Sequence, residues 1–187
     1  MKKFLLSLGL ISALTIAGCS QSDNEDDTAT GDDTAEQQEE DTKSDESNDN
    51  AEVKKELLNA QMDFTSTVSP YQQKINAYQG NLADEEVSEE DIEASAEEAL
   101  TAAKDAQTEL ENYQFEADVP DEVKENYQQA IATLGDYYSE TETAINDSAL
   151  EPDFSAAQDK WDEFQEQITS IYEGQDMFAP NMADALS

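Results

Sequence analysis

The chain has 187 residues, with 46 Asp and Glu against 9 Lys, no Arg, no His and a single Cys, and its net charge is -37. Without imidazole there is no His-based catalysis and no ordinary zinc, copper or haem ligation, and one Cys cannot form an internal disulfide. A surface this acidic repels phosphates, so we expect no nucleic-acid partner.

The charge divides the chain into three segments. Residues 1–18 contain two Lys and no acid, residues 19–52 contain 14 acids and one Lys, and residues 53–187 contain 32 acids and six Lys. These differences predict a short basic start, an acidic linker and a folded body.

The N-terminal segment is typical of a secretory signal. Lys2 and Lys3 precede an apolar run from Phe4 to Ile16. The run is shorter than the about 20 apolar residues that a membrane-spanning helix needs. Its length instead matches the apolar region of a signal peptide, so residues 1–18 are predicted to direct export.

The apolar run ends in Ile16-Ala17-Gly18-Cys19, which resembles the lipobox of bacterial lipoproteins. The resemblance implies cleavage between Gly18 and Cys19 and a diacylglycerol on Cys19, the only Cys of the chain. Two or three acyl chains anchor a protein stably. The resemblance therefore implies a lipid-anchored protein on the extracytoplasmic face of the cell membrane. The alternatives are an uncleaved anchor and an ordinary signal peptide with an unrelated Cys.

The second segment, residues 19–52, is predicted to be a disordered acidic tether. After Cys19 it contains no aromatic residue and no Leu, Ile, Val or Met, so it has nothing to bury. A flexible chain of this length spans roughly 30–35 Å, and repulsion between like charges extends it further.

Apolar residues recur at steps of three and four throughout the third segment, residues 53–187, and predict helices. The first predicted helix follows Leu57 to Leu82, and Pro70 is expected to kink it or to divide it in two. The second begins after Ser88, a predicted N-cap followed by three acids. Its stripe is rich in Ala, which implies a close approach to its neighbours.

Two further helices are predicted by similar signals. One begins at Val119-Pro120, since proline is tolerated in the first helical turn. The other opens at Glu151-Pro152-Asp153 and ends near Gly174, a candidate C-cap. The connections are short, so neighbouring helices should be antiparallel. The predicted fold is all-α, an up-down four-helix bundle preceded by a signal peptide and a disordered acidic linker.

The C-terminal tail, residues 175–187, is apolar beyond the predicted end of the fourth helix. Pro180 prevents simple continuation of that helix. One interpretation is a strap that packs across the end of the bundle, and the other is an exposed hook for a partner. The candidate contact residues of the tail are Met177, Phe178, Met182 and Leu186.

Three aromatic residues were weighed as binding groups. Adjacent helical residues diverge by about 100 degrees, so Tyr138 is expected on the apolar stripe and Tyr137 toward its edge or solvent. An exposed Tyr137 could contact a partner or stack on a cell-wall glycan. Trp161 lies on a stripe and is predicted to be core.

Catalytic motifs give no support for an enzyme. With 32 acids in the body, carboxylate pairs arise by chance and lose their diagnostic value. The Glu-x-x-His motif of di-iron bundles cannot occur without His, and there is no Gly-rich phosphate loop. We predict no enzymatic activity, no cofactor and no metal site.

The order of lipobox, polar linker and helical body is similar in general layout to small helical lipoproteins of Gram-positive bacteria, some of which are described as cell-wall-binding. The predicted function is a lipid-anchored interaction module that binds an exported protein or a cell-wall component through its bundle or tail. The alternative is an acidic structural or cation-buffering surface lipoprotein without a specific partner.

Overall fold

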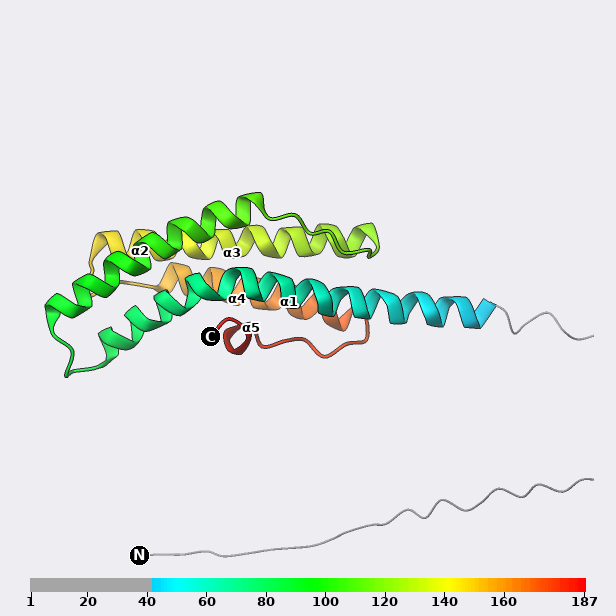
Figure 1. Cartoon of the computed structure of the whole chain (residues 1–187), viewed down its shortest axis with the longest axis horizontal. Helices are drawn as coiled ribbons and strands as arrows, with labels where there is room; N and C mark the ends of the chain where they lie inside the picture. Colours follow the sequence, from blue (N-terminus) through cyan, green and yellow to red (C-terminus); the bar gives the residue numbers. More distant parts are fainter. Residues whose placement is uncertain (1–41) are drawn as a thin grey trace, which may run out of the picture. The chain divides into compact units, whose positions relative to one another are not determined.

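The structure, a computed structural model, describes residues 42–187, with side chains from residue 50 onward. Its helices are α1 (Thr42–Ala83), α2 (Glu89–Asn112), α3 (Asp121–Asp147), α4 (Ser155–Glu173) and the short α5 (Met182–Ala185), and these residues contain no strand. The four long helices lie alongside one another, and consecutive helices run in opposite directions (Figure 1). The predicted all-α bundle is confirmed. No helix between residues 42 and 187 is long and apolar enough to cross a membrane.

Helix α1 begins earlier in the chain than predicted. The segment 42–52, predicted to be disordered as part of the 19–52 linker, is helical. It contains no Gly or Pro, and once a helix is nucleated by the packed turns around Leu57, each further residue adds a hydrogen bond at little entropic cost. The boundary predicted at residue 53 is therefore wrong. The signal peptide, Cys19 and the rest of the linker lie outside the described residues.

Pro70 kinks α1 without dividing it. The helix is continuous from Thr42 to Ala83, and its axis changes direction toward its C-terminal end (Figure 1). Hydroxyl groups before the proline bond to backbone carbonyls of the preceding turn: Ser69 donates to the Thr65 carbonyl at 2.6 Å, and Ser66 to the Asp63 carbonyl at 2.8 Å. Such side-chain bonds, together with the lost proline N–H, are known causes of helix bending.

Helix α2 packs closely on both of its neighbours, as its alanines predicted. Ser88 is its N-cap and accepts a hydrogen bond from the Asp91 backbone N–H at 3.3 Å. The backbones of α1 and α3 both approach α2 closely. The buried small residues that allow this approach are Ala96, Ala99, Ala102, Ala103 and Ala106.

The seam between α1 and α4 is built differently. Backbones come close along α1/α2, α2/α3 and α3/α4, whereas α1 and α4 meet mainly through large side chains. The rings of Phe64 and Phe164 lie 6.4 Å apart across the seam. The Tyr172 hydroxyl donates to the Leu57 carbonyl at 3.2 Å. This wider seam leaves room for a further segment of chain.

The C-terminal tail occupies that room as a strap. The chain reverses after the C-cap Gly174, with Asp176 at a φ of 52°. The Lys54 ammonium lies 3.5 Å from the Asp176 carbonyl, and the Gln73 amide donates to the Ser187 carbonyl at 3.3 Å. These contacts align the strap, residues 175–187, with α1 from residue 54 to residue 73.

One residue of α4 holds the middle of the strap in place. The Gln165 side chain donates to the Pro180 carbonyl at 3.0 Å and accepts from the Met182 backbone N–H at 2.9 Å. Met182 and Leu186 are both fully buried. The tail therefore packs on the bundle as a strap, but it lies along α1 and α4 and not across the end of the bundle, where it was predicted.

Candidate functional site

The predicted contact residues of the tail do not form a common exposed hook. Met182 and Leu186 are 0 % exposed, so the exposed-hook interpretation is wrong for these two, and Met177 is partly buried. They are apolar because they cover the α1/α4 seam. Phe178, in contrast, is 100 % exposed.

Of the two positions expected for Tyr137, the edge of the stripe or solvent, solvent is wrong. Its side chain is buried, and its ring lies 5.1 Å from the Trp161 ring in an edge-on arrangement. The Gln72 amide donates to its hydroxyl at 3.0 Å. Because α3 has neighbours on two sides, its buried face is wider than a single stripe and includes both Tyr137 and Tyr138. Trp161 is partly buried against this core.

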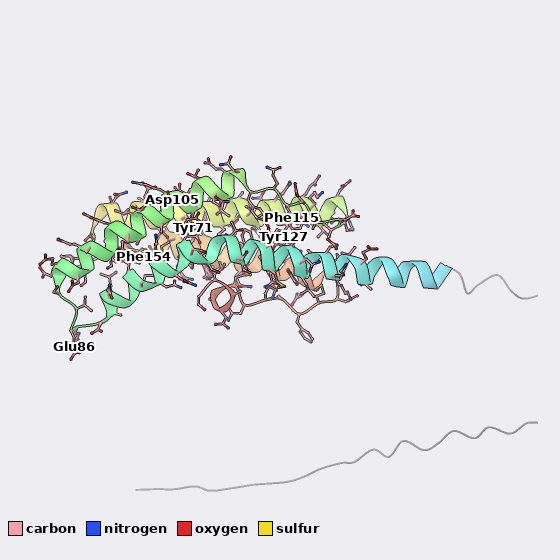
Figure 2. All side chains as sticks on the ribbon, in the orientation of Figure 1. Tyr71, Glu86, Asp105, Phe115, Tyr127 and Phe154 are labelled. Atoms are coloured by element: carbon pink, nitrogen blue, oxygen red, sulfur yellow. The ribbon has the colours of Figure 1, made fainter. Side chains whose placement is uncertain are left out.

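Tyr137 and Trp161 nevertheless both line a pocket at the α1/α4 seam. Its volume is about 160 Å³, and α1, α3, α4 and the strap all contribute to its wall. The lining residues are Gln72, Asn76 and Gln79 of α1, Tyr137 of α3, Phe154, Ala157, Gln158 and Trp161 at the start of α4, and Ala183 of the strap. Figure 2 places Phe154 at this end of the bundle.

The pocket is electrically neutral. Among the described residues, those that line it include no Asp, Glu or Lys. Four side-chain amides and three aromatic rings make up most of its wall. We call this cavity the neutral pocket. A second cavity, between α3 and α4, has two carboxylates in its wall, Glu163 and Glu166.

Hydrogen bonds join Gln72, Asn76 and Tyr137 in the wall of the neutral pocket. The Gln72 Nε2 group donates to Asn76 Oδ1 at 2.9 Å and to the Tyr137 hydroxyl at 3.0 Å, which uses both of its hydrogens. The Gln72 side chain is 5 % exposed, and its Oε1 atom has no hydrogen-bond partner among the residues that the structure describes. A buried acceptor without a partner costs stability. The network therefore leaves one buried acceptor unpaired in the wall behind the pocket.

Burial keeps the Tyr137 hydroxyl neutral. Desolvation raises its pKa above the ordinary value of 10.0, and the hydrogen bond from Gln72 opposes this only in part. The pocket thus contains no group that exchanges a proton near neutral pH. Its chemistry is that of hydrogen bonding and ring contact. Within residues 50–187, no group of three or more Asp, Glu, His or Cys is arranged to hold a metal ion.

The helix that carries the amides is the only long helix that is not strongly acidic. Residues 53–83 contain three Lys against two acids, whereas residues 84–187 contain three Lys against 30 acids. The acids begin again in the connection after α1, where Glu86 lies at the tip of the loop (Figure 2). Residues 53–83 of α1 are thus close to neutral on an acidic molecule, whereas residues 42–52 contain four acids and one Lys.

This contrast was not predicted, although the sequence contains a local signal for it. Residues 64–83 form a run of twenty without Asp or Glu, and all three amides that α1 contributes to the neutral pocket lie in it. Charge was counted over the whole body, 53–187, and the average concealed the run. The pocket itself depends on the α1/α4 spacing, which no spacing of apolar residues reveals.

Two exposed apolar side chains lie on the face of α1 that carries Lys54. Leu58 is 49 % exposed and Met62 is 70 % exposed, and both follow Lys54 at steps of four. Residues four apart share a helix face, and Lys54 contacts the strap at Asp176, two residues before the exposed Phe178. We call Leu58, Met62, the strap around Phe178 and the neutral pocket together the α1 face.

Comparison with known proteins assigns no family. No protein-family model matches the chain, and neither the curated proteins nor the solved structures contain a significant match.

Proposed function

We propose that the protein is a lipid-anchored interaction module on the extracytoplasmic face of the cell membrane, and that it binds an exported protein or a cell-wall component through the α1 face. The observation that carries this proposal is the charge contrast between residues 53–83 and residues 84–187. The anchor follows from the lipobox-like sequence that ends at Cys19.

The α1 face has the composition that binding surfaces favour. The centres of protein interfaces are depleted of charged residues and enriched in aromatic residues and Met. Leu58, Met62 and Phe178 supply exposed apolar area, and the surrounding α1 residues are mainly neutral amides and hydroxyls. Desolvation of carboxylates is costly. A partner that covers this face desolvates few of them. The longest run without Asp or Glu in the other long helices is residues 126–135 of α3, half the length of the run 64–83 in α1.

The anchor is tested by replacing Cys19. In a Cys19→Ala variant expressed with its native signal sequence, the protein should move from the membrane fraction to the soluble extracytoplasmic fraction. A single residue carries the anchor in this account, so the loss should be nearly complete. Partition of the variant with membranes to the same extent as the parent would show that the anchor assignment is wrong.

The binding face is tested by adding charge to it. Leu58→Glu combined with Met62→Glu places two acids on exposed positions of α1, so the fold should be retained. Chemical crosslinking in intact cells should then give at least tenfold less of the crosslinked product that the parent forms. Added charge must be desolvated when a partner covers it.

The matched control is Gln128→Glu combined with Ala132→Glu. These two exposed positions of α3 have the same spacing and gain the same charge. The control should crosslink like the parent. Equal loss in both double variants, or no loss in either, would contradict a binding role for the α1 face.

A further inference from the structure

We propose that the neutral pocket binds one uncharged sugar unit, with its ring against the exposed part of Trp161 and its hydroxyls on the amides of α1. The inference rests on the proposed function and names the ligand class of one part of the α1 face. Three aromatic rings and four amides meet in a pocket without charge.

The lining favours an uncharged ligand. A cation would find no carboxylate in the wall to pair with, and an anion would approach against the field of a body that carries 32 acids. Charged groups without partners are costly to desolvate. A ligand rich in hydroxyl groups has no charge to desolvate, and its hydroxyls can exchange hydrogen bonds with water for hydrogen bonds with the amides of the wall.

Hydroxyl groups also match the unused hydrogen-bonding positions. Both Nε2 hydrogens of Gln72 are used within the network, and its Oε1 atom is buried. The exposed Asn76 accepts through its Oδ1 atom, which leaves its Nδ2 group as a donor. A sugar hydroxyl can accept from this Nδ2 group.

The aromatic wall supplies an apolar surface of fixed orientation. Trp161 is partly buried, and its ring is held edge-on by Tyr137 at 5.1 Å and by Phe164 at 5.7 Å. Phe154 lines the same pocket. A pyranose ring has one face of C–H groups, and such a face packs on the electron-rich face of an aromatic ring.

The dimensions restrict the ligand to one ring at a time. The pocket volume of about 160 Å³ is below the about 300–1,000 Å³ of pockets that enclose drug-sized ligands. A longer glycan would place one unit in the neutral pocket and its neighbours on the rest of the α1 face.

Trp161 is the only Trp in the chain, so its fluorescence reports on the pocket directly. The full lipidated protein, in a detergent without a sugar headgroup, is titrated with N-acetylglucosamine trimer and, separately, with maltotriose. The expected result is a saturable change in Trp161 emission with at least one of them. A response to the first alone identifies an amide-bearing sugar, and a response to both identifies the pyranose ring as the shared determinant.

Two exposed residues of α1 give a matched pair of variants. Asn76→Ala removes an amide that lines the pocket, and Asn59→Ala removes one that does not. Binding should weaken at least tenfold in the first variant and stay unchanged in the second. Circular dichroism on both variants verifies that the helical fold is retained.

Three results would overturn the inference. One is the absence of a saturable change in Trp161 emission with either sugar at concentrations up to about 50 mM, which is about 50 times a weak Kd on the order of 1 mM. Another is equal weakening in both Asn variants. The third is saturation by an uncharged peptide instead of a sugar. None of these results bears on crosslinking of the Leu58 and Met62 variants, so failure here is distinguishable from failure of the proposed function.

Discussion

At the scale of single residues, the buried tyrosine hydroxyls divide into two kinds. The Tyr172 hydroxyl lies 3.2 Å from the Leu57 carbonyl and 3.0 Å from Gln61 Oε1, and it links α4 to α1. The hydroxyls of Tyr127 and Tyr138 are buried without a hydrogen-bond partner among residues 50–187. The same chemical change should therefore have different effects at these positions.

We expect Tyr172→Phe to lower the free energy of unfolding by about 1 kcal/mol, since it removes a hydrogen bond and leaves an acceptor unpaired. Tyr127→Phe should leave stability unchanged or raise it, because the hydroxyl it removes is desolvated without compensation. Urea unfolding of both variants measures the difference. A Tyr127→Phe variant that loses as much stability as Tyr172→Phe would show that the Tyr127 hydroxyl has a partner.

The same tyrosines predict sensitivity to alkaline pH. Burial raises the pKa values of Tyr127, Tyr137, Tyr138 and Tyr172 above the ordinary value of 10.0. The folded state thus holds phenol protons more tightly than the unfolded state. The corresponding stability is fully present below pH 10 and is lost as the pH rises above it.

Thermal melts between pH 8 and pH 12 should show a melting temperature that falls steeply only above about pH 10. Tyr127→Phe removes one of the titrating groups and should reduce the slope. A slope that is identical in the variant and the parent would assign the alkaline loss to other groups.

At the scale of elements, the strap is predicted to be part of the folded body. Met182 is fully buried in the strap and Phe178 is fully exposed, although both are large apolar residues of the same segment. Met182→Ala should lower the free energy of unfolding by about 2–5 kcal/mol, the usual cost of an emptied core position. Phe178→Ala should change it by less than about 0.5 kcal/mol. Equal effects of the two substitutions in chemical unfolding would contradict the packing of the strap.

The helices themselves were predictable because their signals are local. Spacing of apolar residues identified the four long helices, and Ser88 and Gly174 marked two of their ends. The start of α1 was not predictable in this way, since residues 42–52 have no apolar stripe and depend on the packed turns that follow. A kink at Pro70 was one of two predicted alternatives, and division of the helix was the other. Hydrogen bonds from Ser66 and Ser69 to backbone carbonyls accompany the kink in the continuous helix.

The neutral pocket could not be predicted from the sequence, because it depends on the packing of several elements. Tyr137 was expected at the edge of its stripe or in solvent, and contacts with Gln72 of α1 and Trp161 of α4 bury it. Gln72 carried no signal at all, since a glutamine on a helix is ordinarily a solvated residue. Its role follows from its burial and from its bonds to Asn76 and Tyr137.

At the scale of the whole molecule, charge is the dominant property. Residues 53–187 contain 32 acids and six Lys, and the ion pairs that the structure records between residues 50 and 187 involve only Lys55, Lys104 and Lys160. Repulsion between like charges therefore outweighs pairing. Salt screens such repulsion beyond about 8 Å at physiological ionic strength.

We expect the melting temperature to rise when NaCl is increased from about 0.05 M to 1 M, because screening relieves repulsion in the folded state more than in the expanded unfolded state. Differential scanning calorimetry measures the shift. No stabilisation by salt would mean that the carboxylates are spaced too widely to destabilise the fold.

The acids are also unevenly distributed, and this asymmetry underlies the functional account. A charge near neutrality on residues 53–83, beside 30 acids on residues 84–187, gives the molecule one side on which a partner meets apolar groups and amides. The predicted lipid on Cys19 would hold the body at the membrane, and the α1 face would be its contact with the envelope.

Site-specific photo-crosslinking in growing cells tests this central claim most directly. A photoreactive residue is placed in the full chain at Met62 on α1 or, as the matched exposed position, at Ala132 on α3. We predict a discrete crosslinked product from Met62 that is at least tenfold more abundant than any product from Ala132. Equal crosslinking from the two positions, or stronger crosslinking from Ala132, would contradict the α1 face as the binding surface.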